Sequence, residues 1–197
     1  MSMSMPIPAR ERGKIAPAKF AHCVIRTKQF GPLVEWYKTL LEAESIFENP
    51  FVCFMTYDEE HHRVAIVNNP TLEERPLNAV GLDHLAFTYA NIDDLLTTYC
   101  RLRELGITPS TTIHHGPTMS LYYLDPDRNQ VELQIDTFET ATELRTWMES
   151  AQFASNPIGV LFDIESVVAR WKAGEPAHEL RKPIEGPLPG ADAFEPH

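Results

Sequence analysis

Residues 113–132 read IHHGPTMSLYYLDPDRNQVE, and this stretch decides how the rest of the chain is interpreted. A turn sequence, DPDRN at 125–129, separates two segments in which apolar and polar residues alternate. Because Pro fixes one backbone angle and Asp and Asn tolerate tight conformations, these residues predict a hairpin. Alternation with a period of two indicates strands that bury one face. Glu132 then points away from the face of Val131 and Leu133, which leaves a carboxylate inside a strand.

The same order of elements is predicted twice along the chain: a strand, a helix and three further strands. His22 and His84 occupy matching places in the two copies, and the same offset relates Tyr37 to Tyr99. Duplication of one βαβββ unit explains such a repeat. The predicted fold class is therefore α+β, with paired βαβββ modules that form an open, partly closed mixed β-barrel and a C-terminal helical extension. The concave face of that barrel would gather residues from both modules.

The chain divides into four parts on this interpretation. Residues 1–16 contain no apolar run and are expected to be a flexible N-terminal arm rather than a secretory signal. Residues 17–138 form a single domain with modules at about 17–78 and 79–138. Residues 139–173 are predicted to form helices that act as a lid, with a loop over 150–160. Residues 174–197 are rich in proline and are expected to be an extended strap or disordered.

Two features support helices after residue 139. Thr140 followed by Glu143 is a capping box, which marks a helix start. An apolar face is expected for that helix, and a last helix is predicted from Asp163 to Trp171. The apolar face consists of Leu144, Trp147 and Met148.

The composition restricts the classes of function. The chain has 197 residues, 43% hydrophobic and 23% charged, as in soluble globular proteins. Its net charge of −11 argues against nucleic acid or an anionic membrane as a partner. No apolar run approaches the ~18 residues of a membrane span. Three single cysteines without CxxC spacing predict reduced thiols in the cytoplasm.

Two histidines and one carboxylate in the predicted strands suggest a metal site. His22, His84 and Glu132 each lie off the more apolar face of a strand. Two imidazoles and one carboxylate form the facial triad of non-haem Fe(II), which leaves positions for substrate and dioxygen. Each residue alone could be an ordinary polar residue of a strand, since His is often partly buried. The matching places of the two histidines in the repeat favour the metal site.

The stretch from Ile113 resembles the signature of the type I extradiol ring-cleavage dioxygenases, which belong to the vicinal oxygen chelate superfamily. Arg128 departs from that signature, because the family has Gly or Pro there. The sequence EEHHRVAIV at 59–67 is similar to a second strand of the family. The resemblance covers about 20–138, the size of a single catalytic domain. The positions that match the signature are Ile113, His115, Leu121, Tyr122, Asp125, Pro126 and Glu132.

The resemblance implies a role for each matching residue. The two histidines and the glutamate named above resemble the ligands of Fe(II), which Mn(II) could replace. His62 resembles an acid–base histidine, and a His with a pKa near ~6.5 can take a proton at neutral pH. Tyr122 resembles the tyrosine that hydrogen-bonds a substrate oxygen, and His115 the histidine that flanks substrate and tyrosine. The implied reaction cleaves a catechol-type diol with O2 to a ring-opened semialdehyde or keto acid.

Two alternative functions remain open at this point. One is a glyoxalase-like metal-dependent lyase or isomerase, which needs a second carboxylate ligand from the first module. The residue at the repeat offset before Glu132 is Pro70, which cannot bind a metal. A neighbouring residue such as Glu48 could supply the carboxylate instead. The other is a metal-free binding protein of the bleomycin-resistance kind. Such a protein would have no reason to keep the histidines, the glutamate and Tyr122 in register.

Several further expectations concern single residues and assembly. His61 and His62 could be an exposed hairpin end beside acidic residues, whereas Tyr123 and His114 are interpreted as structural. Superfamily proteins of this size commonly pair their sheets, so a homo-oligomer, dimer or larger, is expected. An apolar lining would suit a catechol with a hydrophobic substituent. The residues predicted to form it are Phe51, Phe54, Phe153 and Ile158.

Overall fold

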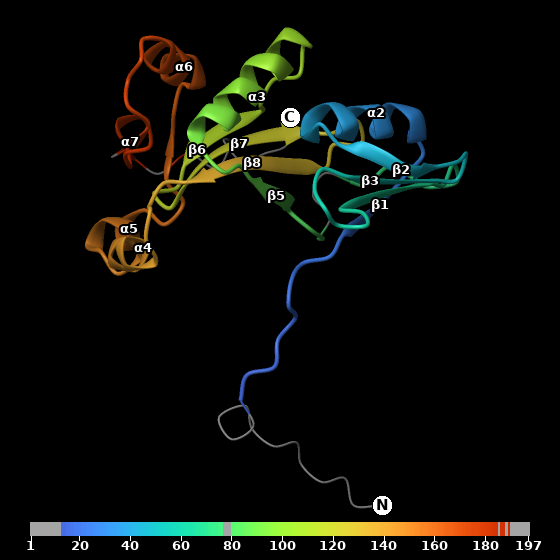
Figure 1. Ribbon diagram of the computed structural model, residues 1–197, viewed down its shortest axis with the longest axis horizontal. Coiled ribbons are helices and arrows are strands. Elements are labelled where there is room, and N and C mark those ends of the chain that lie inside the picture. The colour runs from blue at the N-terminus through green and yellow to red at the C-terminus, as the bar shows by residue number, and fades with distance from the viewer. Residues whose placement is uncertain (1–12, 77–79, 185, 188, 190–197) are drawn as a thin grey trace, which may run out of the picture.

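The computed structural model describes residues 13–76, 80–184, 186, 187 and 189 (Figure 1). The first module contains β1 (Cys23–Thr27), α2 (Phe30–Leu41), β2 (Glu44–Glu48), β3 (Val52–Thr56) and β4 (Val64–Asn68). Its four strands form a sheet in the order β1-β4-β3-β2. Only the β1–β4 pairing is parallel, as a crossover through α2 requires.

The second module repeats this arrangement with β5 (His84–Thr88), α3 (Ile92–Glu104), β6 (Thr111–His114), β7 (Thr118–Leu124) and β8 (Gln130–Asp136). Its sheet has the order β5-β8-β7-β6-β9, where β9 (Val160–Leu161) is added by the C-terminal part. The predicted βαβββ repeat is confirmed. The two sheets remain separate among the described residues, so the barrel is open, and helices α2 and α3 lie on the same side of them (Figure 1).

Both modules bury the expected faces in one hydrophobic core. The alternate residues Val131, Leu133 and Ile135 of β8 are buried against the helices. Helix α3 begins after Asn91, because the side chain of Asn91 accepts a hydrogen bond from the backbone of Asp94. The helix ends at a glycine with φ of +78°. Local pattern and capping chemistry therefore account for the elements.

The predicted turn at 125–129 holds the two modules together. The Asp125 carboxylate is 4% exposed and accepts hydrogen bonds from the backbone N–H groups of Asp127 and Asn129. It also accepts one from the Tyr37 hydroxyl of α2, at 3.2 Å. Arg128 has φ of +65°, a conformation that favours glycine. Arg128 thus adopts the left-handed conformation at the position where the dioxygenase signature allows Gly.

The C-terminal part differs from the predictions in three places. Helix α4 (Ala141–Met148) has the predicted capping box, but none of its residues is buried, so its apolar face is covered only in part. A short helix, α5 (Ala151–Ser155), replaces the expected loop because the Ser150 side chain caps it. Helix α6 (Ile164–Lys172) confirms the last predicted helix. The expected strap contains a further helix, α7 (Ala177–Leu180), since Leu180 is buried in the core.

Parts of the predicted terminal segments lie outside the described residues. These parts are residues 1–12 of the arm and residues 185, 188 and 190–197 of the tail. Residues 13–16 are exposed and belong to no helix or strand. Across the ranges that the structure describes, no helix has the length and apolar character needed to cross a membrane.

Candidate metal centre

His84 at the start of β5 lies beside Glu132 of β8. Both belong to the face of the second sheet that is turned away from the helices, because Val131 and Leu133 face the core. Nε2 of His84 is 3.0 Å from Oε2 of Glu132, and Glu132 is only 4% exposed. Two ligand atoms at right angles, each about 2.1 Å from a divalent ion, lie about 3.0 Å apart. The pair therefore fits two neighbouring positions around an octahedral metal ion.

A carboxylate orients the His84 ring. Nδ1 of His84 lies 2.6 Å from Oδ2 of Asp83. Histidines that bind metals almost always donate their second N–H to a carboxylate, a carbonyl or a water. Nδ1 then carries the proton, and Nε2 is available as a ligand beside Glu132. The sequence interpretation missed Asp83, although a carboxylate directly before a predicted ligand histidine was a visible signal.

Tyr122 and His115 extend this group. Tyr122 pairs with Glu132 across β7 and β8, and its hydroxyl lies 2.8 Å from Nε2 of His115. Nδ1 of His115 contacts the carbonyl oxygen of Ile158, which can only accept, so Nε2 accepts from the tyrosine. Burial, followed by the charge of Glu132, raises the pKa of Tyr122, and burial lowers the pKa of His115. A protonated tyrosine and a neutral histidine result at neutral pH.

The other predicted histidines gather on the first sheet. His22 precedes β1 and His62 precedes β4, with ring centres 4.2 Å apart. Nδ1 of His61 is 2.7 Å from Nδ1 of His62, and the Phe54 ring lies 4.9 Å from the His62 ring. Burial, followed by the charge of His22, lowers the pKa of His62. His62 is half-buried, and its lowered pKa leaves the ring unprotonated near neutral pH. His61 is exposed.

One chain does not bring the three predicted ligands together. In the part of the chain that the structure describes, one group of three His, Cys, Asp or Glu residues has ligand atoms within 4.8 Å, and it consists of His22, His61 and His62. His84 and Glu132 form the separate pair described above. A hollow of about 1330 Å³ between β1 and β5 is lined by none of the six predicted site residues.

Strand register identifies the residue of the first module that matches Glu132. Glu132 pairs with Ala86 in the second sheet, and Ala65 pairs with Val24 in the first. Ala86 and Val24 each lie two residues after a predicted ligand histidine. The match is therefore Ala65 and not Pro70, because the loops of the two modules differ in length. Alanine has no ligand atom, so this position supplies no second carboxylate.

The predicted apolar lining is divided between the same two places. Phe54 lies against His62, whereas the carbonyl of Ile158 contacts His115. Phe153 is half-buried in α5, and Phe51 is 72% exposed. The structure thus contains two partial sites: an imidazole group on the first sheet, and a His–Glu–Tyr group on the second.

Comparison with known proteins relates this chain to a family. Residues 19–133 match the model of the Glyoxalase/Bleomycin resistance protein/Dioxygenase superfamily. Biphenyl-2,3-diol 1,2-dioxygenase 2 of Rhodococcus globerulus is 45% identical over 166 residues, which cover 84% of this chain and 87% of that protein. Biphenyl-2,3-diol 1,2-dioxygenase 3 of the same organism is 44% identical over 164 residues, which cover 82% and 86%.

Similarity to solved structures agrees with the fold. The glyoxylase/bleomycin resistance protein/dioxygenase domain from Frankia sp. EAN1pec aligns with a TM-score of 0.51 and 17% identity. The alignment covers 61% of this chain and 99% of that domain. At this identity the likeness concerns the arrangement of strands and helices alone.

Proposed function

This chain belongs to the Glyoxalase/Bleomycin resistance protein/Dioxygenase superfamily, and from that premise we propose how its site works. The chain is an extradiol dioxygenase, an enzyme that cleaves the ring of a catechol-type diol with O2. The 45% identity over 84% of the chain is the observation that carries this activity. We propose biphenyl-2,3-diol, or a catechol with a similar apolar substituent, as its substrate.

We propose His22, His84 and Glu132 as ligands of Fe(II), for which Mn(II) can substitute with the same donors. Two observations support the assignment: the 3.0 Å spacing of His84 and Glu132, and the carboxylate of Asp83 behind the His84 ring. A metal ion held by these residues would supply Lewis acidity, which would lower the pKa of the diol hydroxyl.

The remaining site residues handle protons and orientation. His62 stands next to His22 and is unprotonated near neutral pH, so it takes a proton from the diol and later returns one. Tyr122 keeps its proton and donates it to Nε2 of His115, so its oxygen accepts a hydrogen bond from a substrate hydroxyl. His115, held by the Ile158 carbonyl, fixes the direction of the Tyr122 hydroxyl. Burial of this group excludes water from the side of Glu132.

The activity is tested by ring cleavage itself. Protein loaded with Fe(II) under anaerobic conditions is mixed with 2,3-dihydroxybiphenyl in air-saturated buffer. Uptake of one O2 per diol, with a product that absorbs near the visible range, is expected. A lyase or a binding protein would consume no O2, and that result would reject the dioxygenase.

The ligand assignment is tested by Glu132→Ala. This variant is expected to lose its iron on gel filtration while keeping its circular dichroism spectrum, because the carboxylate is one of three protein ligands. Glu104→Ala, at an exposed position of α3, is the matched control and should retain iron. Full activity of Glu132→Ala would end the assignment.

We also infer a homo-oligomer and a cytoplasmic location. The three cysteines are all unpaired, which supports a reducing compartment. The ligand-bearing faces of both sheets are open, which supports association of copies.

A further inference from the structure

Three imidazole rings gather on the first sheet in an arrangement that can bind a metal ion. His22, His61 and His62 can each contribute one ring nitrogen so that the three atoms lie within 4.8 Å of one another. The centres of the rings are 4.2, 4.5 and 6.0 Å apart. Two of the rings are exposed and the His62 ring is half-buried, so an ion from solution can reach all three. The proposed reaction uses His22 and His62 but gives His61 no role.

The closest contact in this group joins His61 to His62. Nδ1 of His61 lies 2.7 Å from Nδ1 of His62. Two neutral rings at this distance share one proton, because one nitrogen must donate and the other must accept. A metal ion can replace that proton and bind both nitrogens, since the neutral imidazole nitrogen is the form that binds metals. Two nitrogens each about 2.0 Å from a tetrahedral Zn(II) ion lie about 3.3 Å apart, so the rings need to separate only slightly.

A carboxylate lies behind the His61 ring. Nε2 of His61 is 3.5 Å from Oε1 of Glu60, whose side chain is 8% exposed. Histidines that bind metals almost always donate their second ring N–H to a carboxylate, a carbonyl or a water. With Nδ1 on a metal ion, Nε2 of His61 carries the proton and faces this carboxylate. The arrangement matches that of Asp83 and His84 on the second sheet, with the roles of the two ring nitrogens exchanged.

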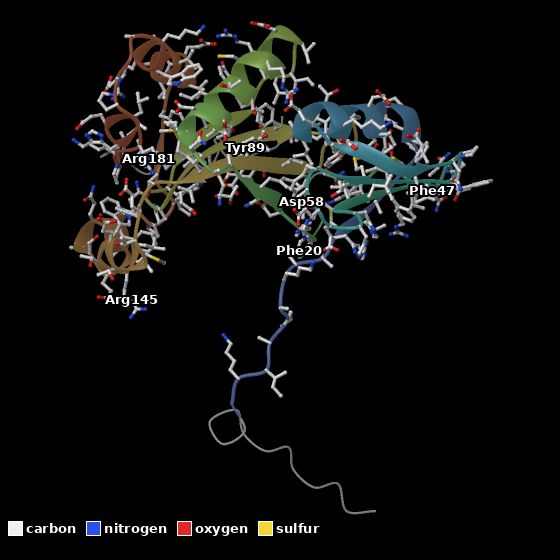
Figure 2. The ribbon with its side chains drawn as sticks, viewed as in Figure 1. Phe20, Phe47, Asp58, Tyr89, Arg145 and Arg181 are labelled. Carbon is white, nitrogen blue, oxygen red and sulfur yellow. The ribbon has the colours of Figure 1, made fainter. Side chains whose placement is uncertain are left out.

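Arg63 holds the segment before His22 against the loop that carries the other two histidines. Its guanidinium donates hydrogen bonds to the carbonyl oxygens of Phe20 and Ala21. The same guanidinium pairs with the Asp58 carboxylate, at 3.0 Å. Figure 2 shows Phe20 and Asp58 at the end of the first sheet where the N-terminal segment enters. The backbone around the three rings is therefore fixed before an ion binds, which reduces the entropy lost on binding.

The set of donor atoms indicates which metal ion fits. Among the described residues, the group consists of three imidazoles and includes neither a carboxylate nor a thiolate ligand. Zn(II) uses three histidines with water in the fourth position of a tetrahedron. Ca(II) and Mg(II) prefer oxygen ligands, and the Fe(II) of oxygenases combines two histidines with a carboxylate. Zn(II) is therefore the ion that this group fits best.

We propose that His22, His61 and His62 bind one Zn(II) ion on the first sheet, and that this ion inhibits the enzyme. The inhibition rests on the proposed function, whereas the binding does not. Zn(II) at this place would occupy His22, a proposed ligand of Fe(II), and the nitrogen with which His62 accepts a proton. It would contribute no oxidation or reduction of its own, because Zn(II) has no redox chemistry. Excess zinc would therefore suppress turnover without changing the fold.

Calorimetric titration of untagged, metal-free protein with ZnCl2 tests the binding. Glu132→Ala protein is the background, because it lacks the pair of His84 and Glu132 that could bind another ion. One Zn(II) per chain is expected. Adding His61→Gln to this background should weaken the affinity at least about tenfold, since even the partners behind metal ligands change affinity by about 10–100-fold. Adding His178→Gln instead, at another exposed histidine, should leave the affinity unchanged.

Two results would overturn this zinc site. One is the absence of Zn(II) binding by the folded background protein, and the other is equal affinity with and without His61→Gln. His22→Gln provides a further measurement and should weaken the affinity to a similar extent; an unchanged affinity would overturn the arrangement of three imidazoles. Circular dichroism verifies the fold of each variant, and Glu132→Gln replaces Glu132→Ala if the alanine variant does not fold.

Oxygen uptake with 2,3-dihydroxybiphenyl tests the inhibition. Wild-type protein loaded with Fe(II) is expected to lose activity as ZnCl2 is added. His61→Gln should begin near the wild-type rate and should need at least about tenfold more Zn(II) for the same loss. Equal sensitivity of the two proteins to Zn(II) would overturn the inhibition. Absence of O2 uptake before zinc is added would reject the proposed function and the inhibition with it, whereas the calorimetric titration would still decide the binding.

Discussion

Asp83 directly precedes a proposed ligand, and its carboxylate holds the His84 ring at 2.6 Å. Outer partners of this kind commonly change metal affinity by about 10–100-fold. We expect Asp83→Asn to lose iron to a chelator at a concentration 10–100-fold lower than the wild type requires. Asp136→Asn, at the exposed end of β8, is the control. Equal retention of iron by both variants would show that Asp83 does not support the site.

His62 lies against the His22 and Phe54 rings, where burial lowers its pKa. His62→Phe keeps the packing and removes the proton acceptor. Because general acid–base groups contribute about 10²–10⁴-fold, we expect a loss of about 10²-fold or more in kcat with iron retained. His61→Phe, at the exposed neighbour, should lose far less. A loss below about tenfold in His62→Phe would contradict the acid–base role.

At the scale of elements, the segment between α5 and β9 controls the position of His115. Gly159 has φ of +106°, and a Cβ there would lie 2.3 Å from the His114 carbonyl oxygen and 2.6 Å from Cα of His115. The Ile158 carbonyl, one residue earlier, contacts the His115 ring. Only glycine allows the segment to approach so closely. The segment therefore acts as a support for the His115–Tyr122 pair.

Gly159→Ala should push this segment away and release the His115 ring. We expect reduced kcat with iron retained, because the metal ligands lie elsewhere. Gly174→Ala is the matched control: its φ is +84°, but a Cβ would meet nothing within 4 Å. It carries the same backbone strain without the collision. Wild-type kcat in Gly159→Ala would show that the segment does not position His115.

At the scale of the whole molecule, His114 connects the second sheet to the C-terminal part. It is 1% exposed, accepts a hydrogen bond from the Gly116 backbone at Nδ1 and donates from Nε2 to the Arg181 carbonyl. Burial lowers the pKa of His114. At a pH between the pKa of His114 in the folded chain and its pKa in the unfolded chain, the unfolded chain binds more protons. The stability that depends on neutral His114 is therefore present above about pH 6.5 and is lost as the pH falls through the folded pKa.

We expect the free energy of unfolding in urea to decrease between pH 7 and pH 5, and this decrease to be smaller in His114→Gln. His178→Gln is the control, because that side chain is 66% exposed. It should leave the pH dependence unchanged. Parallel pH profiles for the wild type and His114→Gln would contradict the conclusion that neutral His114 contributes to the stability.

Much of this molecule follows from local pattern. The period of two around DPDRN, the capping box at Thr140 and the βαβββ repeat all predicted elements that the structure contains. These features depend on residues close together in the chain, so spacing alone reveals them. The dioxygenase signature likewise identified the family, because its Tyr and Glu are fixed by one hairpin, in which they pair directly.

Tertiary structure decided what spacing could not. The strand register showed that Ala65 is the residue of the first module that corresponds to Glu132, because loops of different length shift the repeat along the sequence. Packing of Leu180 turned part of a proline-rich tail into a helix. Above all, the packing of the two modules groups His22 with His61 and His62, whereas His84 lies beside Glu132. Which faces of two modules meet depends on contacts between distant residues, and no local period records them.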